Sequence, residues 1–242
     1  MHRTCIAYAL TLARAGDPPP LEQLIARAHT RMREDFRRSR RGEYRARPKH
    51  IVGLVEHELA LPVSDAEWKA NWEVAEGCLR TFYASRWLAR ARTLAREDWL
   101  PIDQIDSFQL EGIKVFAGPD FAFRDEGTTV LVDWKTGRPR DEDREQVKGY
   151  ALYAAAKWGA APERVLARLV YLGAGEEIDV NVTPAALEEF REFFRSSVSS
   201  MKALLRDPER NLAAKDDFPM HEDPSRCRGC CFQRLCGRNE SP

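Results

Sequence analysis

The chain has 242 residues, enough for one large domain or two small ones, and its hydrophobic content of 43% allows a proper core. Its 38 Lys and Arg residues balance its 38 Asp and Glu residues, so net charge alone does not indicate a nucleic-acid partner. No apolar run approaches the length of a membrane span and no signal peptide is visible, so we expect a cytoplasmic protein without a membrane partner.

The first hundred residues are predicted to be helical, because their apolar residues recur at helical spacing. Helices are expected over 1–16, over 21–41, and from a cap at Ser64 or Asp65 to about 87, with a further apolar-periodic segment at 51–59. Residues 27–50 contain ten Lys and Arg residues against three Asp and Glu residues. Such a basic block is either a solvated helix face or a surface that contacts phosphates.

The pattern changes to strands after residue 100. Residues 103–110 and 113–117 predict a hairpin that turns at Glu111-Gly112, and 118–123 and 128–134 predict two further strands joined by the turn residues 124–127. A helix over 141–157, a hairpin of 165–172 and 177–182, and a helix that starts at Pro184 follow. The apolar stripe of this last helix is expected to be core: Leu187, Phe190, Phe194, Val198, Met201 and Leu205. We therefore expect a central mixed sheet flanked by helices.

The second of the two central strands ends in charged residues. Asp133 and Lys135 are two apart, so they project to the same face of the sheet, while Trp134 projects to the other. If the two strands pair, Asp120 lies beside Asp133. Two carboxylates and one ammonium then converge, and carboxylate oxygens are the ligands that Mg²⁺ and Mn²⁺ prefer. A surface ion pair of no functional importance is the alternative.

The residues Pro119-Asp120 followed by Asp133-Trp134-Lys135 resemble the motif of the PD-(D/E)XK nuclease superfamily. The resemblance implies an α/β, restriction-endonuclease-like fold over a single domain, 1–242. Within it we expect a helical region at 1–100, a nuclease core at 101–206 and a cysteine-cluster tail at 207–242.

Two further motifs resemble the RecB-like branch of this superfamily. Gly53-Leu54-Val55-Glu56-His57 is similar to the segment whose histidine binds the catalytic metal, which implies that role for His57, together with Asp120, Asp133 and the Trp134 carbonyl. A packed, hydrogen-bonded histidine is the alternative. Gln146 and Tyr150 share a helix face and resemble the Q-x-x-x-Y motif, whose residues orient the substrate strand or the attacking water. The alternative for this pair is a core tyrosine with a polar edge.

The cysteines indicate a second metal centre, because disulfides are uncommon in the cytoplasm. Cys227, Cys230 and Cys236 need a fourth thiolate to complete a zinc site or a four-iron cluster, and Cys5 or Cys231 could supply it. The pattern is similar to the iron–sulfur subset of RecB-like nucleases, which includes AddB and the CRISPR-associated iron–sulfur exonucleases. The resemblance implies a [4Fe–4S] cluster on Cys5, Cys227, Cys230 and Cys236, with zinc or free thiols as alternatives. Cys78 is expected to be core.

These resemblances together predict a Mg- or Mn-dependent deoxyribonuclease that acts as an exonuclease on single-stranded or unwound DNA. DNA repair, recombination and CRISPR-type DNA processing are the processes implied, with a helicase or a recombination or CRISPR protein as a possible partner. Lys135 is either the base or an electrostatic stabiliser of the hydroxide and phosphate. The alternative function is a catalytically silent DNA-binding module that carries an iron–sulfur cluster or zinc.

Overall fold

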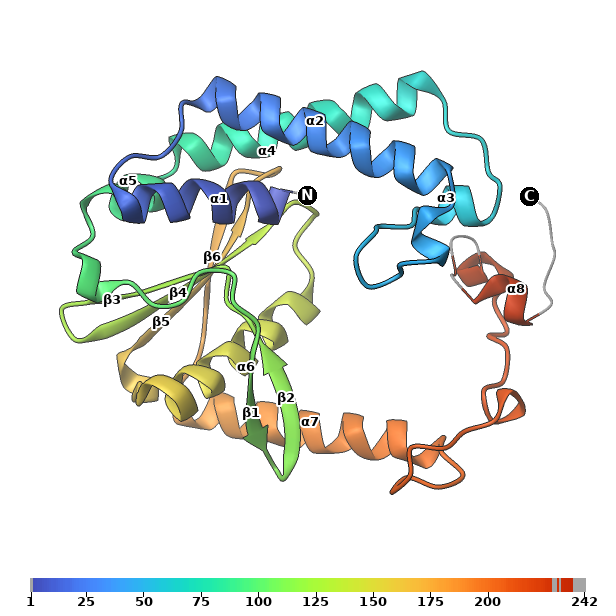
Figure 1. Cartoon of the computed structure of the whole chain (residues 1–242). Coiled ribbons are helices and arrows are strands. Elements are labelled where there is room, and N and C mark those ends of the chain that lie inside the picture. The colour runs from blue at the N-terminus through green and yellow to red at the C-terminus, as the bar shows by residue number, and fades with distance from the viewer. Residues whose placement is uncertain (1, 228–229, 231, 237–242) are drawn as a thin grey trace. The chain divides into compact units, whose positions relative to one another are not determined.

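The structure, a computed structural model, describes residues 2–227, 230 and 232–236 (Figure 1). It divides into two compact units, each of which is described by itself. Unit 1 comprises Met1–His29 and Ala70–Arg195, and unit 2 comprises Thr30–Lys69 and Ser196–Pro242. The longer helices are α1 (His2–Ala15), α2 (Leu21–Arg40), α4 (Asp65–Ala84), α5 (Arg86–Thr93), α6 (Asp141–Trp158) and α7 (Pro184–Ala203). Along the described part of the chain, we find no helix with the length and apolar character needed to cross a membrane.

The centre of unit 1 is a four-stranded mixed sheet, as the sequence predicts. Its strands follow the order β3 (Phe121–Asp125), β4 (Thr128–Lys135), β5 (Val165–Tyr171) and β6 (Glu176–Val180). The outer pairs are antiparallel, whereas β4 and β5 are parallel. A parallel pair needs a long crossover, and α6 supplies it between β4 and β5 (Figure 1).

Strand alternation gives the sheet two apolar faces, each buried by different helices. On one face Val130, Val132 and Trp134 pack with residues of α1, α4 and α5. On the other face Leu131, Leu169 and Tyr171 pack with residues of α6 and α7. Because side chains alternate along a strand, Asp133 and Lys135 belong to the α6 face together with Leu131. The predicted separation of these two residues from Trp134 is confirmed.

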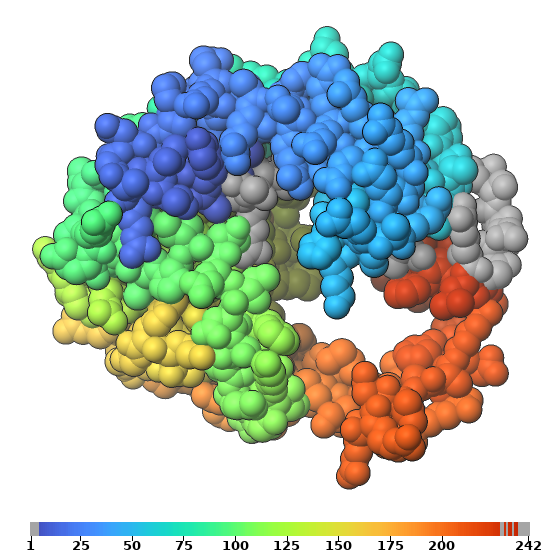
Figure 2. All heavy atoms as spheres, in the orientation of Figure 1, coloured from blue at the N-terminus to red at the C-terminus, as the bar shows by residue number. Residues whose placement is uncertain are grey.

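A separate two-stranded hairpin precedes the sheet. Its strands, β1 (Asp106–Leu110) and β2 (Ile113–Ala117), pair with Leu110 opposite Ile113, so Glu111 and Gly112 form the turn. Both turn residues have positive φ, 52° and 73°, the backbone conformation of a two-residue hairpin turn of type I′. The predicted turn is confirmed, and the hairpin lies at the surface in the space-filling view, coloured green (Figure 2).

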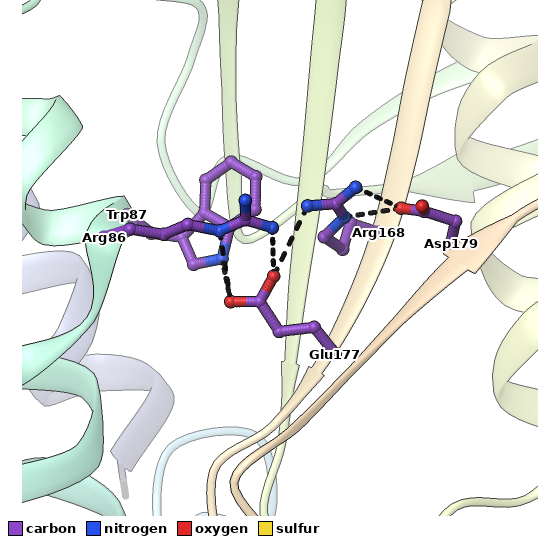
Figure 3. Close-up of polar contacts among 5 residues, drawn as sticks. All are labelled: Arg86, Trp87, Arg168, Glu177 and Asp179. Carbon is purple, nitrogen blue, oxygen red and sulfur yellow. Dashed lines mark hydrogen bonds and ion pairs between the residues drawn. The ribbon is translucent and has the colours of Figure 1, made fainter.

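A polar network joins α5 to strands β5 and β6 (Figure 3). Glu177 accepts a hydrogen bond of 3.0 Å from Trp87 Nε1 and forms ion pairs with Arg86 and Arg168. Arg168 also pairs with Asp179 on the neighbouring strand. The Arg86 guanidinium lies 4.6 Å from the centre of the Trp87 ring, so the same tryptophan has a cation over its face. This network ties the end of one covering helix to the edge of the sheet.

Unit 2 corrects one local expectation and shows contacts that the sequence does not indicate. In the predicted segment 51–59 only Val55–Glu58 (α3) is helical, and Gly53 accommodates Tyr44, because a Cβ at Gly53 would lie 2.8 Å from that ring. Glu58 accepts hydrogen bonds from the Tyr44 hydroxyl and from Arg45. These contacts are not local in sequence, so helical periodicity could not reveal them.

The core assignment for the stripe on α7 holds only for its first part. Leu187 and Phe190 are buried, whereas Met201 is 57% exposed. Leu187 and Phe190 belong to the part of α7 in unit 1, whereas Met201 belongs to the part in unit 2, which begins at Ser196.

Candidate active site

Two carboxylates lie opposite each other where β3 and β4 pair. Phe121 pairs with Val132 in the antiparallel register, so the next residues outward, Asp120 and Asp133, face each other on one side of the sheet. Both are nearly buried, with exposed fractions of 8% and 4%. Asp120 Oδ2 accepts a hydrogen bond of 3.0 Å from the backbone N–H of Trp134. The β4 backbone therefore fixes the orientation of the Asp120 carboxylate, and the predicted convergence of the two carboxylates is observed.

Lys135 completes this group and links the strand to α6. Its ammonium lies 2.8 Å from Asp133 Oδ2 and donates a hydrogen bond to Gln146 Oε1. Gln146 in turn donates a hydrogen bond of 2.7 Å to the Tyr150 hydroxyl. The pair that was expected to share a helix face thus forms one hydrogen-bonded chain that begins at the lysine. Tyr150 is also packed in the core, so its core position and its polar contact coexist.

Asp143 and Tyr171 belong to the same group, and the sequence reasoning missed both. Asp143, in the first turn of α6, is 5% exposed, and its Oδ1 lies 3.7 Å from the Lys135 ammonium. The Tyr171 hydroxyl donates a hydrogen bond of 3.0 Å to Asp143 Oδ2. Burial, and then this hydrogen bond, raises the pKa of Tyr171. The feature that could have revealed Tyr171 is the parallel register of β4 and β5, which sets it opposite Lys135. This register cannot be assigned from the sequence until it is known which strands pair.

A cavity of about 330 Å³ opens over these side chains. Asp120, Asp133, Lys135 and Gln146 line it, with Arg140 at the N-terminal end of α6. A concave site with convergent polar groups is the usual form of a binding or catalytic pocket. The opposed carboxylates fit a divalent cation such as Mg²⁺, which proteins commonly hold by one or two carboxylates together with water and substrate phosphate. Within the described residues no group of three or more His, Cys, Asp or Glu side chains is placed to hold a metal ion.

His57 lies in unit 2, on the single turn of α3. Its Nδ1 is 2.8 Å from the hydroxyl of Ser39, which is buried and also accepts the backbone N–H of Leu54 at 2.8 Å. Phe36 packs edge-on against the imidazole, with ring centroids 4.7 Å apart. The ring is therefore oriented by a hydroxyl on one nitrogen, an arrangement that suits both a packed histidine and a metal ligand.

The cysteines of the predicted cluster belong to both units. Cys5 is buried on α1 in unit 1, whereas Cys227, Cys230 and Cys236 belong to unit 2. The backbone N–H of Cys230 donates to the Cys227 carbonyl at 3.0 Å. Cys231 lies outside the described residues. Cys78 is buried among apolar side chains, as expected, and burial raises the pKa of its thiol.

The basic block forms several local ion pairs. Arg31 pairs with Asp35 at 3.0 Å, and Arg38 pairs with Glu43 at 3.1 Å. Arg45 pairs with Glu58 at 2.9 Å. These arginines are therefore partly neutralised by neighbouring carboxylates, and the block's excess of charge is carried by its other members.

Comparison with known proteins identifies a family and a weak likeness to solved structures. A family model described as "PD-(D/E)XK nuclease superfamily" matches residues 7–237. The search of curated proteins finds no match. A solved structure described as "Crystal structure of SSO0001" is similar over 77% of this chain and 93% of that chain, with 11% sequence identity and a TM-score of 0.34.

Proposed function

The chain belongs to the PD-(D/E)XK nuclease superfamily, and on that basis we propose that it is a Mg- or Mn-dependent deoxyribonuclease. The observation that supports this proposal most is the set of three side chains in one cavity: opposed Asp120 and Asp133, with Lys135 paired to Asp133 at 2.8 Å. Both carboxylates are nearly buried, so removing their charges from water costs much free energy. A bound cation would offset this cost.

The predicted site residues that line the cavity have proposed roles. Asp120 and Asp133, with the Trp134 carbonyl, would hold the divalent ion, which when bound lowers the pKa of water and neutralises charge on a phosphate. Lys135 would donate its ammonium hydrogens to the phosphate or to the attacking hydroxide. Gln146 would hold that ammonium in place, since it already accepts from it and is itself bonded to Tyr150.

We further propose that His57 contributes an imidazole ligand to the same ion. The support is the similarity of its segment to the RecB-like motif, together with the Ser39 hydroxyl at Nδ1. If Nδ1 carries the proton and donates it to Ser39, the other ring nitrogen has its lone pair available for a metal. An imidazole ligand favours Mn²⁺ over Mg²⁺, which prefers oxygen. His57→Ala should therefore weaken activity in Mg²⁺ and abolish the preference for Mn²⁺.

The decisive experiment is cleavage of labelled single-stranded and double-stranded DNA by wild type and by Asp133→Asn, in Mg²⁺ and in Mn²⁺. We expect Asp133→Asn to lose cleavage and retain DNA binding, because phosphate contacts come mainly from Lys and Arg. Asp125→Asn is the matched control, because Asp125 lies at the end of β3 that is far from Asp120 and pairs with Arg90. Wild-type cleavage by Asp133→Asn would refute the assignment, and DNA binding without cleavage by wild type would favour a silent binding module.

The finer activity we propose is exonucleolytic action on single-stranded or unwound DNA, beside a helicase or a recombination or CRISPR protein. The support is the combination of the RecB-like motifs around His57, Gln146 and Tyr150. A substrate labelled at one end tests it, because an exonuclease releases mononucleotides or short products progressively from an end. Cleavage of a closed circular single strand would contradict it.

We also propose a [4Fe–4S] cluster on Cys5, Cys227, Cys230 and Cys236. Its support is the spacing of these cysteines in the sequence. Among the described residues these cysteines do not form a metal-binding group of three or more. Because four cysteine ligands would leave no position open for substrate, the proposed role of the cluster is structural. Anaerobically purified wild type should contain about four irons per chain, the content of such a centre, and Cys5→Ser should lose them. If Cys231→Ser loses iron instead, then Cys231 is the fourth ligand, and stoichiometric zinc without iron would replace the cluster with a zinc site.

A further inference from the structure

A second concavity of about 400 Å³ lies in unit 1 and has a different chemistry from the first. Aromatic and aliphatic side chains dominate its lining, among them Ile105, Phe116, Phe190 and Phe193, and we call it the apolar groove. These residues come from the segment before β1, from β2 and from α7. The groove is therefore assembled from segments distant in sequence.

The groove leaves large apolar side chains in contact with solvent. Ile105 is 69% exposed, Phe116 65% and Phe193 55%. Phe190, which also lines the groove, is buried, and its ring centroid lies 6.2 Å from that of Phe193. Single exposed apolar residues are ordinary, but three that line one concavity form a contiguous patch of the kind that binds a ligand.

The groove is continuous with the candidate active site. Gln146, which accepts a hydrogen bond from Lys135, lines both concavities, and Tyr150, its other partner, lines the groove. Phe116 lies four residues before Asp120, with only Ala117, Gly118 and Pro119 between them. A ligand whose phosphate binds the ion proposed for Asp120 and Asp133 can therefore place its next unit in the groove.

The groove also has a cation at its aromatic rim. The Lys114 ammonium lies 5.1 Å from the centre of the Phe116 ring. An aromatic face beside a positive charge complements a nucleotide, since a base stacks on the ring while its phosphate meets the cation.

We propose that the apolar groove binds unpaired bases of the nucleic-acid strand whose phosphate occupies the adjacent site, with Phe116 and Phe193 as stacking surfaces. This inference rests on the proposed nuclease function and deepens it, because it gives a physical reason for preferring a single strand. In a duplex the bases are stacked on each other and paired, so their faces are not available to the two phenylalanines.

The test measures binding, by fluorescence anisotropy with Ca²⁺ as the divalent ion, which carboxylate oxygens also ligate. The probes are a labelled oligothymidylate, the same strand with consecutive abasic sites, and a blunt duplex of equal length. Wild type should bind the oligothymidylate about tenfold or more tightly than the abasic strand, because base–aromatic stacking contributes about 1–3 kcal/mol per base. Phe116→Ala and Phe193→Ala should each reduce that ratio severalfold.

Two further variants separate stacking from simple apolar contact. Phe116→Leu keeps an apolar side chain without a flat ring and should behave like Phe116→Ala, whereas Phe116→Trp should restore binding. Phe218→Ala is the control, because Phe218 is an exposed aromatic residue of unit 2, 49% exposed, and it should bind as wild type does. Melting temperatures of all variants should agree, because the altered rings are solvent-exposed.

Two results would overturn the inference: equal affinity of wild type for the abasic and the oligothymidylate strands, or full affinity in Phe116→Leu, which would indicate apolar contact without stacking. These failures are distinguishable from failure of the nuclease proposal. If wild type cleaves DNA but Phe116→Ala cleaves it with unchanged KM, only the groove assignment is refuted. If base-dependent binding stands but no metal supports cleavage, only the nuclease proposal is refuted.

Discussion

The buried pair of Asp143 and Tyr171 offers the sharpest test of how the candidate site is held together. Their hydrogen bond of 3.0 Å is buried, and Asp143 also lies 3.7 Å from the Lys135 ammonium. We consider three variants: Asp143→Ala, Tyr171→Phe and the double variant. Asp143→Ala leaves a buried phenolic hydroxyl without this acceptor, whereas Tyr171→Phe removes the hydroxyl and leaves the carboxylate with Lys135 as a partner.

The magnitudes follow from the burial of both groups. A hydrogen bond to a charged group contributes about 1.5–3 kcal/mol, and a buried group that loses its partner costs about 1–3 kcal/mol. We therefore expect Asp143→Ala to lower the free energy of unfolding by about 2–3 kcal/mol and Tyr171→Phe by about 1–2 kcal/mol. The double variant should cost less than the sum, with a coupling of about 0.5–3 kcal/mol, because the orphaned hydroxyl is then absent.

Urea denaturation of the four proteins measures these values, and DNA cleavage by Asp143→Asn provides the functional readout. Asparagine retains an acceptor for Tyr171 and removes the negative charge beside Lys135. We expect near-normal stability and a fall in kcat of about tenfold with little change in KM, which corresponds to about 1.4 kcal/mol of transition-state stabilisation. Strictly additive effects on unfolding in the cycle would refute the direct bond, and unchanged kcat in Asp143→Asn would refute its role in positioning Lys135.

Three further predictions concern stability and reactivity in unit 1. Glu177→Gln should lower the free energy of unfolding by about 1 kcal/mol in urea denaturation, because it removes the charge that Arg86 and Arg168 share at the sheet edge. The loss is small because the site is partly exposed, and no change would show that solvent already screens these ion pairs. Cys78, whose thiol pKa is raised by burial, should resist iodoacetamide at pH 8 until the protein unfolds, and rapid labelling of the native protein would contradict this. The pKa of Asp106 is lowered, first by the Ser107 N–H and then by Lys157, so its contribution to stability is present above its unfolded pKa and is lost as pH falls through the folded value. The stability difference between wild type and Asp106→Asn should therefore shrink below about pH 4, as followed by thermal melts across pH.

How far the sequence predicts this fold depends on how local each feature is. The turn at Glu111-Gly112 and the alternation around Trp134 are local, and both appear as predicted. Ser64 caps α4 as expected, since its hydroxyl accepts the Glu67 N–H and its own N–H donates to that glutamate. Such features need only neighbouring residues to specify them.

Features that depend on distant pairing could not be predicted in the same way. Asp143 is one of three acidic residues in the first turn of α6. Carboxylates are common at this position in any helix, because the positive end of the helix dipole stabilises them. Only the parallel alignment of β4 and β5 brings Tyr171 to it. Likewise, the bond between Tyr44 and Glu58 joins residues fourteen apart through an irregular segment, which no periodicity describes. The roles of Asp120, Asp133, Lys135, His57 and the cysteines stay predictions until the variants are assayed.

Trp134 faces two environments at once, and this has a practical consequence. Its backbone N–H holds Asp120 in the candidate site, while its ring lies on the opposite face of the sheet, stacked on Phe121 at 5.9 Å and edge-on to Phe82 at 5.3 Å. An ion that draws the Asp120 carboxylate toward itself pulls on the same peptide that carries the indole. We therefore expect the emission of the Trp134 indole, which is 8% exposed, to change when an ion binds the carboxylates, so that binding can be followed without an added dye.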